Sequence, residues 1–206
     1  MDTVWSRRRT EPKPRLTLDR IVAEALALLD EEGVARLTMR RLAERLGTGS
    51  TTLYWHVKTK DDVLDLAMDA VFGEVGLPDG GAGEDWRAGV RALMGGWRAA
   101  LLRHPWSATL LDRPLLGPNA LSRTEFLYET LIAAGFAAPT TAAYSLSNYV
   151  MGSVIMQVTW ARSDADVGGY LRERAGDYPA LAAHGLEHDW DATFEEGLGY
   201  LLAGMS

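Results

Sequence analysis

The stretch from Thr38 to Lys60, TMRRLAERLGTGSTTLYWHVKTK, places the strongest constraint on the fold of this chain. A Gly-Thr-Gly sequence at positions 47–49 separates two short segments, and its glycines permit a sharp change of direction between helices. The second segment carries three consecutive ring side chains, Tyr54, Trp55 and His56. Three adjacent residues of a helix cannot all face a core. The stretch therefore predicts two helices joined by a tight turn, and a second helix that presents these rings to solvent.

The second helix, expected from Ser50 to about His56, has the chemistry of an element that reads DNA. Leucines at positions 42, 46 and 53 and a valine at position 57 can form its apolar underside. Hydroxyl and aromatic groups then lie on the outer side, and Lys58 and Lys60 follow them. Exposed polar and aromatic side chains beside cations fit the major groove of DNA.

The charge distribution agrees with a local contact to nucleic acid, although the chain as a whole has a net charge of -7. Residues 1–60 carry 12 Lys and Arg against 8 Asp and Glu, a net charge of +4. Residues 61–206 carry 9 against 20, a net charge of -11. This asymmetry predicts a basic head that approaches phosphate groups and an acidic body that is held away from them.

Composition excludes several classes of function. The 206 residues include no cysteine, which excludes disulfides, thiolate nucleophiles and cysteine-ligated metal centres. No apolar run reaches the length of a membrane span, and no signal peptide is recognisable, so a cytoplasmic protein without membrane contact is expected. The chain also lacks a P-loop and a Gly-x-Ser-x-Gly elbow. We therefore predict no enzyme activity, no cofactor and no metal site.

The periodicity of apolar residues predicts an all-α fold in three parts. Residues 1–16 form a basic arm, residues 17–75 a helical head that contains the two helices and the turn described above, and residues 76–206 a helical body. The arm has two open interpretations, an extension along DNA or a solvated tail. Within the body, residues 163–177 are polar and contain glycine, and they are expected to form a mobile loop.

Capping residues mark where the helices of the head begin and end. Thr17 or Asp19 opens the first helix and Gly33 ends it, and Thr38 can cap the second. The sequence Thr59-x-x-Asp62 matches a capping box, which predicts that the fourth helix begins there.

The residues of the head also carry a family resemblance. The strings LTMRRLAERLG and TLYWHVKTKDDVLDLAM closely resemble the N-terminal DNA-binding domain of the TetR family of transcriptional regulators, and YWHVK is typical of its tetracycline-repressor branch. The resemblance covers residues 17–72 and continues more weakly through WRAALLRHP, DRP and AAGF. It implies an all-α homodimer that assembles through its C-terminal helices, binds a palindromic operator in double-stranded DNA and responds to a small-molecule effector. It also implies that residues 17–75 are a helix-turn-helix DNA-binding domain of three helices with a connecting fourth helix, and that residues 76–206 are a helical effector-binding and dimerisation domain.

The resemblance further implies which residues contact DNA. The matching positions in the family contact phosphates and bases, and here they are Arg40, Ser50, Thr51, Thr52, Tyr54, Trp55, His56 and Lys60. Ser50 and Thr51 depart from the residues of the tetracycline repressor itself, so a different base specificity is expected.

A long helix expected over residues 139–161 has two uses. One face can pack against its mate in a dimer, and the other can line a pocket with Asn148 and Gln157 as polar handles. Ordinary core packing is the alternative for each apolar residue taken singly. The candidate effector-binding residues are Trp97, Trp106, Arg113, Tyr128, Tyr144, Asn148, Met151 and Met156.

Metal chemistry is disfavoured at two places. The tetracycline repressor chelates a magnesium–drug complex through a His and a Glu, and local alignment places Thr109 and Met156 there, neither of which ligates metal. An apolar or aromatic effector is therefore expected. His184 and His188 have a spacing that can bind zinc, but Gly185 between them favours two surface histidines.

These observations predict a repressor that a ligand releases from DNA. Two alternatives stay open at this point. One is a transcriptional activator of the same fold, and the other is a helical small-molecule-binding protein or enzyme with a vestigial DNA-binding head.

Overall fold

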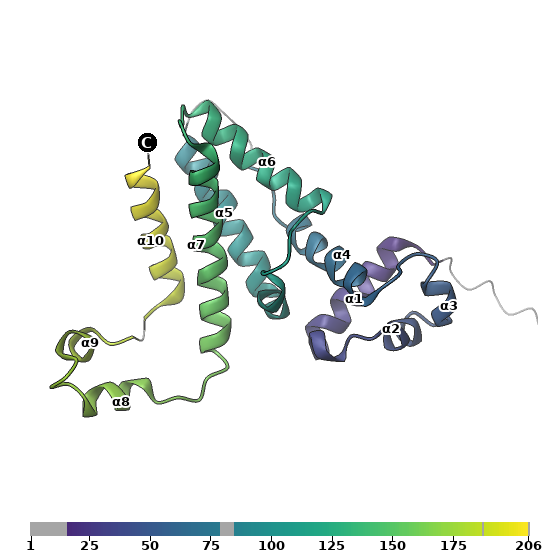
Figure 1. The fold of residues 1–206 in the computed structure, drawn as a ribbon, viewed down its shortest axis with the longest axis horizontal. Coiled ribbons are helices and arrows are strands. Elements are labelled where there is room, and N and C mark those ends of the chain that lie inside the picture. Colours follow the sequence, from purple (N-terminus) through teal and green to yellow (C-terminus); the bar gives the residue numbers. More distant parts are fainter. Residues whose placement is uncertain (1–15, 79–84, 187, 206) are drawn as a thin grey trace, which may run out of the picture. The chain divides into compact units, whose positions relative to one another are not determined.

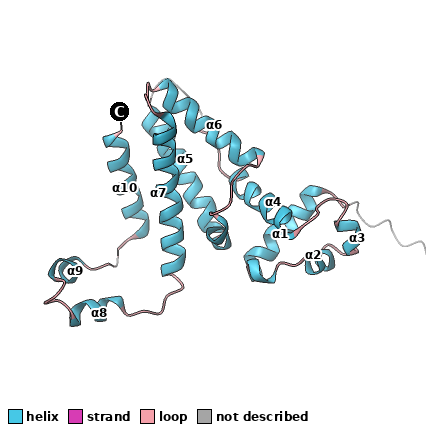
Figure 2. Cartoon of the chain, in the orientation of Figure 1, coloured by secondary structure: helices cyan, strands magenta, loops and turns pink. Residues whose placement is uncertain are grey.

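The computed structural model describes residues 16–78, 85–186 and 188–205, and every regular element within these ranges is a helix (Figures 1 and 2). The all-α prediction is therefore confirmed. Contacts divide the chain into two compact units, one that ends at Leu64 and one that begins at Asp65. Apart from the buried Leu16, the predicted arm lies outside the described residues. None of the helices in these ranges is long and apolar enough to cross a membrane.

The first unit, the head, is built on helices whose ends follow the predicted caps. Its elements before α4 are α1 (Leu18–Glu32), the short 3-10 helix η2 (Val34–Arg36), α2 (Met39–Arg45) and α3 (Ser50–Leu53). The hydroxyl of Thr17 accepts a hydrogen bond from the first turn of α1, and that of Thr38 does the same for α2. Gly33 ends α1 with φ of 77°, a conformation that favours glycine.

The apolar faces of these helices meet in one small core. Ile21 and Leu28 of α1 are fully buried, as are Leu42 of α2 and Leu53 of α3. Each of these residues removes its whole side chain from water, which stabilises the head by roughly 2 kcal/mol per residue. The head therefore has a packed interior of its own.

Helix α4 (Lys60–Gly73) begins at the predicted capping box. The Asp62 backbone N–H donates to Thr59 Oγ1 at 3.0 Å, and the Thr59 backbone N–H donates to Asp62 Oδ2 at 3.1 Å. The Thr59 hydroxyl also donates to Asp62 Oδ1 at 2.8 Å. Hydrogen bonding from Thr59, together with the backbone N–H of Lys58, lowers the pKa of the Asp62 carboxyl. The prediction of a capping box is confirmed.

The second unit, the body, is a set of helices arranged around α5 and α7. Its elements after α4 are α5 (Trp86–Arg103), the 3-10 helix η3 (Pro105–Leu110), α6 (Pro118–Ala133), α7 (Pro139–Trp160), α8 (Val167–Glu173), α9 (Pro179–His184) and α10 (Trp190–Gly204). Helix α7 packs along α5, and α6 and α10 contact both of these helices (Figure 1).

Helix α7 buries one stripe of residues and exposes large apolar side chains on the rest of its surface. The buried residues Leu146, Val150, Val154 and Val158 recur every four positions, as a helix packed on one side requires. On the remaining surface of α7, Ile155 is 41% exposed and other large apolar side chains are also exposed. Part of this surface contacts α10, where the ring of Tyr149 stacks on that of Phe194, and part of it stays open to solvent.

A buried arginine joins α5, α7 and α10. Arg98 on α5 is only 8% exposed, and its Nη1 donates to Asp191 Oδ1 at 2.7 Å. Its Nη2 donates to Gln157 Oε1 at 2.6 Å, and its guanidinium lies over the ring of Phe194. Gln157, predicted as a polar handle for a ligand, is therefore used inside the helix packing.

The prediction of a loop over residues 163–177 is wrong, because α8 (Val167–Glu173) lies within this range. Asp166 caps α8 by accepting a hydrogen bond from the backbone N–H of Gly169 at 2.7 Å. Leu171 is buried, although the surrounding residues are polar. One capping side chain and one buried leucine are enough for a short helix that the composition conceals.

The expected boundary at residues 75 and 76 also differs from the division by contacts, which falls within α4 after Leu64. The physical reason is the burial of the second half of this helix. Met68, Val71 and Phe72 are each at most 2% exposed and belong to the unit that begins at Asp65. The helix that was expected to connect two domains is thus part of both.

The capping box predicts a pH dependence of stability. Because the pKa of Asp62 is lowered in the folded state, its stabilisation is present above the ordinary carboxyl pKa and is lost as pH falls through the lowered value. We expect Asp62→Asn to lower the melting temperature at pH 7, and this deficit to shrink as the pH falls below about 4. Circular dichroism melts across this range measure the effect.

Asp61→Asn is the matched control for this experiment, because it removes the same charge from the same turn but leaves the hydrogen bonds of the box intact. A deficit for Asp62→Asn that stays constant down to pH 2.5, or that equals the deficit of the control, would contradict the prediction.

Candidate functional site

The turn between α2 and α3 is closed by backbone hydrogen bonds. The N–H of Gly47 donates to the carbonyl of Glu44 at 3.1 Å, and the N–H of Thr48 donates to that of Ala43 at 3.0 Å. Gly47 has φ of 63°, which glycine adopts at little cost and other residues rarely adopt. The chain then extends through Gly49 and enters α3.

Helix α3 is shorter than expected, because it ends at Leu53 and residues 54–56 form turns. The turns continue the helical direction, since the Tyr54 N–H donates to the Ser50 carbonyl at 3.0 Å and the Val57 N–H to the Leu53 carbonyl at 3.1 Å. Leu53 and Val57 are buried and hold the segment on the head. The predicted apolar underside is therefore present.

The opposite side of this segment is open to solvent. Trp55 is 79% exposed and Tyr54 is 44% exposed. His56, Thr51 and Thr52 are exposed as well, whereas Ser50 at the start of α3 is half-buried. An exposed tryptophan beside a tyrosine and a histidine is costly to leave in water and indicates a surface that contacts another molecule.

Two of the cations expected at this surface have partners within the head. The Lys60 ammonium donates to the carbonyl of Val34 at 2.7 Å and so joins the start of α4 to η2. Lys58 Nζ donates to the carbonyl of Tyr54 at 2.8 Å and so stabilises the turn that carries the three rings. Arg40 pairs with Glu44 one helical turn away, but the Arg40 side chain is 86% exposed, and an exposed pair of this kind contributes little to stability.

The other arginines of α2 bind α1. Arg41 donates to Glu32 from Nε at 3.2 Å, and Arg45 pairs with Glu24 and Glu31. The hydrogen bond from Arg45 lowers the pKa of Glu31. Arg41, in the first turn of α2, thus joins two helices of the head.

A cavity of about 520 Å³ lies in the body, in the size range of small-molecule sites. Phe72 of α4 and Trp97 of α5 form an edge-to-face pair on its wall, with ring centroids 5.6 Å apart. The other lining residues come from the segment before α6 and from α6 and α7. They are Leu111, Asp112, Arg113, Pro114, Leu115, Ala120, Thr124, Tyr128, Ala143, Tyr144, Ser147, Asn148 and Met151.

The wall of this cavity combines rings with a few polar groups. Arg113, Tyr128 and Asn148 offer hydrogen-bond donors among apolar neighbours. The indole Nε1 of Trp97 is buried and has no hydrogen-bond acceptor among the residues described. Such a donor costs about 1–3 kcal/mol when it is left unpaired. The wall of the cavity thus combines aromatic and apolar surface with several hydrogen-bond donors.

Six of the eight predicted effector-binding residues line this cavity: Trp97, Arg113, Tyr128, Tyr144, Asn148 and Met151. The structure does not bring Trp106 and Met156 to it. Trp106 is buried in η3 with its ring 6.0 Å from that of His104, and Met156 is 58% exposed and lines a separate cavity between α7 and α10.

The prediction missed several lining residues, among them Phe72, Thr124 and Ser147. Thr124 precedes Tyr128 by one helical turn, and Ser147 precedes Met151 by one turn. Helical spacing from the predicted residues would have identified both of them. No local signal marks Phe72, because its role depends on how α4 packs against α5.

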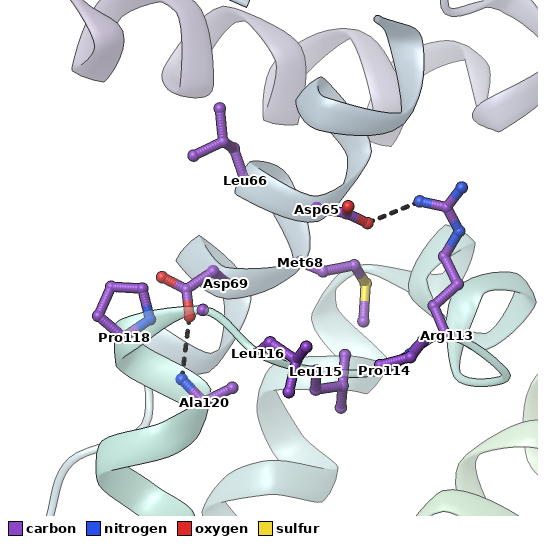
Figure 3. A pocket seen from close by; sticks show the side chains of 11 residues that line it. Asp65, Leu66, Met68, Asp69, Arg113, Pro114, Leu115, Leu116, Pro118 and Ala120 are labelled. Carbon is purple, nitrogen blue, oxygen red and sulfur yellow. Dashed lines mark hydrogen bonds and ion pairs between the residues drawn. The ribbon is translucent and has the colours of Figure 1, made fainter.

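A second cavity of about 550 Å³ lies on the other side of the segment before α6 (Figure 3). Asp65 and Asp69 of α4 face this segment across it, as Figure 3 shows. Arg113 Nη1 donates to Asp65 Oδ1 at 2.7 Å, and Asp69 Oδ1 accepts from the backbone N–H of Ala120 at 3.0 Å. Arg113, Ala120 and the residues between them thus connect α4 to the wall of the first cavity.

The two histidines considered as zinc ligands do not share a helix. α9 ends at His184, and Gly185 follows with φ of 73°. His188 lies against Trp190, with ring centroids 4.3 Å apart. The helical spacing that zinc binding would need is therefore broken, and no cluster of three or more metal-ligating side chains occurs in the ranges that the structure covers.

The geometry defines a class of protein: a helix-turn-helix head that exposes an aromatic face, joined to a helical body with a cavity of small-molecule size. Two family models match the chain. The model of bacterial regulatory proteins of the tetR family matches residues 21–67, and that of the tetracyclin repressor-like C-terminal domain matches residues 77–206. The chain belongs to the TetR family, and it is a DNA-binding transcriptional regulator.

Individual relatives agree with this assignment. An HTH-type transcriptional regulator of Saccharopolyspora erythraea is 50% identical over 98% of this chain and 91% of its own length. The HTH-type transcriptional repressor DrrR1 of Streptomyces coeruleorubidus is 36% identical over 76% of this chain and 59% of its own. The solved structure of the TetR family protein ActR of Streptomyces coelicolor in complex with actinorhodin has a TM-score of 0.82 and is 34% identical, covering 93% of this chain and 97% of ActR.

The burial of Leu53 predicts that this side chain anchors α3, and with it the exposed rings that follow, to the core of the head. We expect Leu53→Ala to lower the free energy of unfolding by about 2–5 kcal/mol, because it leaves a cavity under α3. Thr52→Ala, one residue earlier but exposed, should change it by less than about 0.5 kcal/mol. Urea denaturation followed by circular dichroism compares the two variants, and equal effects would show that Leu53 does not anchor the helix.

Proposed function

We propose that this regulator is a repressor that binds an inverted-repeat operator as a homodimer and is released by a small apolar or aromatic ligand. The proposal rests on how the segment from α3 to Val57 is oriented. Leu53 and Val57 are buried against the head, whereas Tyr54, Trp55 and His56 on the opposite side are exposed. A helix seated in this way can enter the major groove with its outer side chains on the bases.

We assign DNA contact to three groups of residues. The rings of Tyr54, Trp55 and His56 contact bases and the sugar-phosphate backbone, and the exposed hydroxyls of Thr51 and Thr52 and that of Ser50 supply further hydrogen bonds. Arg40 binds phosphate in exchange for Glu44. Lys60 is the weakest member of the predicted set, because its ammonium already binds the carbonyl of Val34.

The homodimer is proposed from exposed apolar side chains on α7 and α10. Ile155 and Met156 of α7 are 41% and 58% exposed, and Tyr200 of α10 is 69% exposed. Large apolar side chains gathered on neighbouring helices are typical of surfaces that a second chain covers. A two-fold symmetric pair presents two recognition helices, which explains why an inverted repeat is expected.

Release by a ligand is proposed from the cavity beside Phe72 and Trp97. Its volume of about 520 Å³ and its ring-lined wall suit an aromatic molecule of several fused rings. ActR, which resembles this chain over most of its length, was solved in complex with actinorhodin, and DrrR1 is named a repressor. A ligand releases DNA only if it binds more tightly to the conformation that does not fit the operator.

Alanine substitutions test the DNA-binding face. The operator is first selected from random duplexes by the purified chain. We expect Tyr54→Ala and His56→Ala each to weaken binding roughly 5- to 150-fold, as loss of 1–3 kcal/mol of base contact implies. Tyr178→Ala removes a similarly exposed tyrosine from the body and should leave the affinity unchanged. Fluorescence anisotropy measures all three, and unaltered affinity of the head variants would refute the assignment.

A charged substitution tests the dimer surface. We expect Ile155→Asp to shift the chain from dimer to monomer in light scattering coupled to gel filtration, because a carboxylate at a buried interface loses its hydration. Ile132→Asp places the same charge at an exposed isoleucine of α6 and should leave the dimer intact. If both variants stay dimeric, the α7 surface is not the interface.

A further inference from the structure

The segment from Leu111 to Ala120 is a wall shared by two cavities. The first is the cavity of about 520 Å³ beside Phe72 and Trp97, here called the ring-lined cavity, and the second is the cavity of about 550 Å³ beside α4. Both are lined by Arg113, Pro114, Leu115 and Ala120. A ligand in the first cavity therefore touches residues whose other side faces α4. Figure 3 shows the guanidinium of Arg113 turned toward Asp65 on that helix.

Two carboxylates of α4 hold this wall. Asp65 pairs with Arg113, and Asp69, one helical turn later, accepts hydrogen bonds from the side chain of Asn119 and the backbone of Ala120, both at 3.0 Å. Residues four apart lie on the same face of a helix. A Cβ added to Gly117 would overlap the Asp69 side chain, so the wall approaches α4 as closely as its backbone allows.

The two attachments differ in strength. Asp69 binds the N-terminal end of α6, where a carboxylate is favoured by both hydrogen bonds and the helix dipole. The ion pair of Arg113 and Asp65 is more exposed, with side-chain exposures of 27% and 63%. Exposed pairs of this kind contribute little to stability, so Asp65 is a partner that a competing anion can replace.

The ring-lined cavity can supply this competitor. Arg113 contributes to its wall, and a guanidinium can bind a carboxylate through two parallel hydrogen bonds. A ligand acid held among Phe72, Trp97 and Tyr128 is also better shielded from water than Asp65 is. Asp112, which lines the cavity and is exposed, is the acidic neighbour that opposes an anionic ligand.

We propose that the effector is an acidic aromatic molecule whose acid group binds Arg113 in place of Asp65, and that this exchange is how the occupied cavity acts on α4. The inference rests on the proposed function and adds a ligand class and a route of control to it. Loss of the pair removes one attachment between α4 and the wall. The conformations of α4 that the pair disfavours then become more populated, and the ligand selects them.

Matched pairs of probes test the requirement for an acid. Naphthalene-2-carboxylic acid and anthracene-2-carboxylic acid are each compared with their primary amides by isothermal titration calorimetry on the full chain. We expect at least one of the acids to bind at least about tenfold more tightly than its amide, because Arg113 is a permanent cation. Equal affinities within each pair, or binding of none of the four probes, would overturn the proposal.

Variants test the exchange itself. We expect Arg113→Gln to remove the preference for the acid and Arg113→Lys to keep part of it. Asp65→Asn should strengthen acid binding on the order of fivefold, because no carboxylate then competes for Arg113, and should leave amide binding unchanged. Asp112→Asn removes the same charge from the same wall without touching α4, and it should give a smaller gain. If Asp112→Asn raises the affinity for the acid as much as Asp65→Asn does, the gain comes only from removing a nearby negative charge, and the proposed exchange is wrong.

Measuring release of the selected operator by acids and by amides distinguishes a failure of this inference from a failure of the proposed function. In the anisotropy assay, Asp65→Asn should lower the concentration of acid that releases half of the DNA, whereas Asp112→Asn should lower it less. If amides release DNA as well as acids do, the Arg113 exchange is wrong and the ligand-released repressor stands. If acids bind through Arg113 but the operator stays bound, release by this ligand class is wrong and the Arg113 site stands.

Discussion

Helix α4 supplies residues to both compact units, and the segment that lines both cavities of the body is attached to it. Its first turn is fixed by the Thr59 and Asp62 capping box in the head. Its later turns carry Asp65 and Asp69 toward the wall before α6, and Phe72 into the wall of the ring-lined cavity. The same helix therefore supplies a capping box to the head and two carboxylates and an aromatic ring to the cavity walls of the body.

The charged contacts of the chain fall into two kinds that serve different purposes. Arg98 is buried, donates to two side chains on two helices and lies over an aromatic ring, so its loss would disturb the packing of the body. Arg113 has a more exposed carboxylate partner and lies beside a cavity. The first arrangement suits permanent structure. The second suits a contact that is made and broken, because little free energy separates the two states.

Much of the fold follows from local signals. Gly33, which has a positive φ, ends α1 where the sequence predicts, and the predicted hydroxyl caps begin helices at Thr17, Thr38 and Thr59. The exposed rings from Tyr54 to His56 also follow from the sequence, since adjacent helical residues cannot share one buried face. Short elements are less predictable, as α8 shows, because one buried leucine decides its position.

The residues of the candidate sites also differ in whether local sequence or tertiary packing decides their position. Six residues of the ring-lined cavity could be predicted because aromatic and polar side chains recur on amphipathic helices, but Trp106 and Met156 lie elsewhere. Which side of a helix meets which neighbour depends on packing between segments far apart in sequence, and a local pattern does not encode it.

The sequence by itself determined the helical class, the helix-turn-helix and its exposed rings, because capping, glycine conformation and apolar spacing act within a few residues. Only the tertiary structure decided that Lys60 binds the carbonyl of Val34, that Phe72 reaches the cavity and that Arg113 meets Asp65. Each of these contacts joins residues at least 25 positions apart or depends on such packing. Their geometry exists only once the helices have packed together.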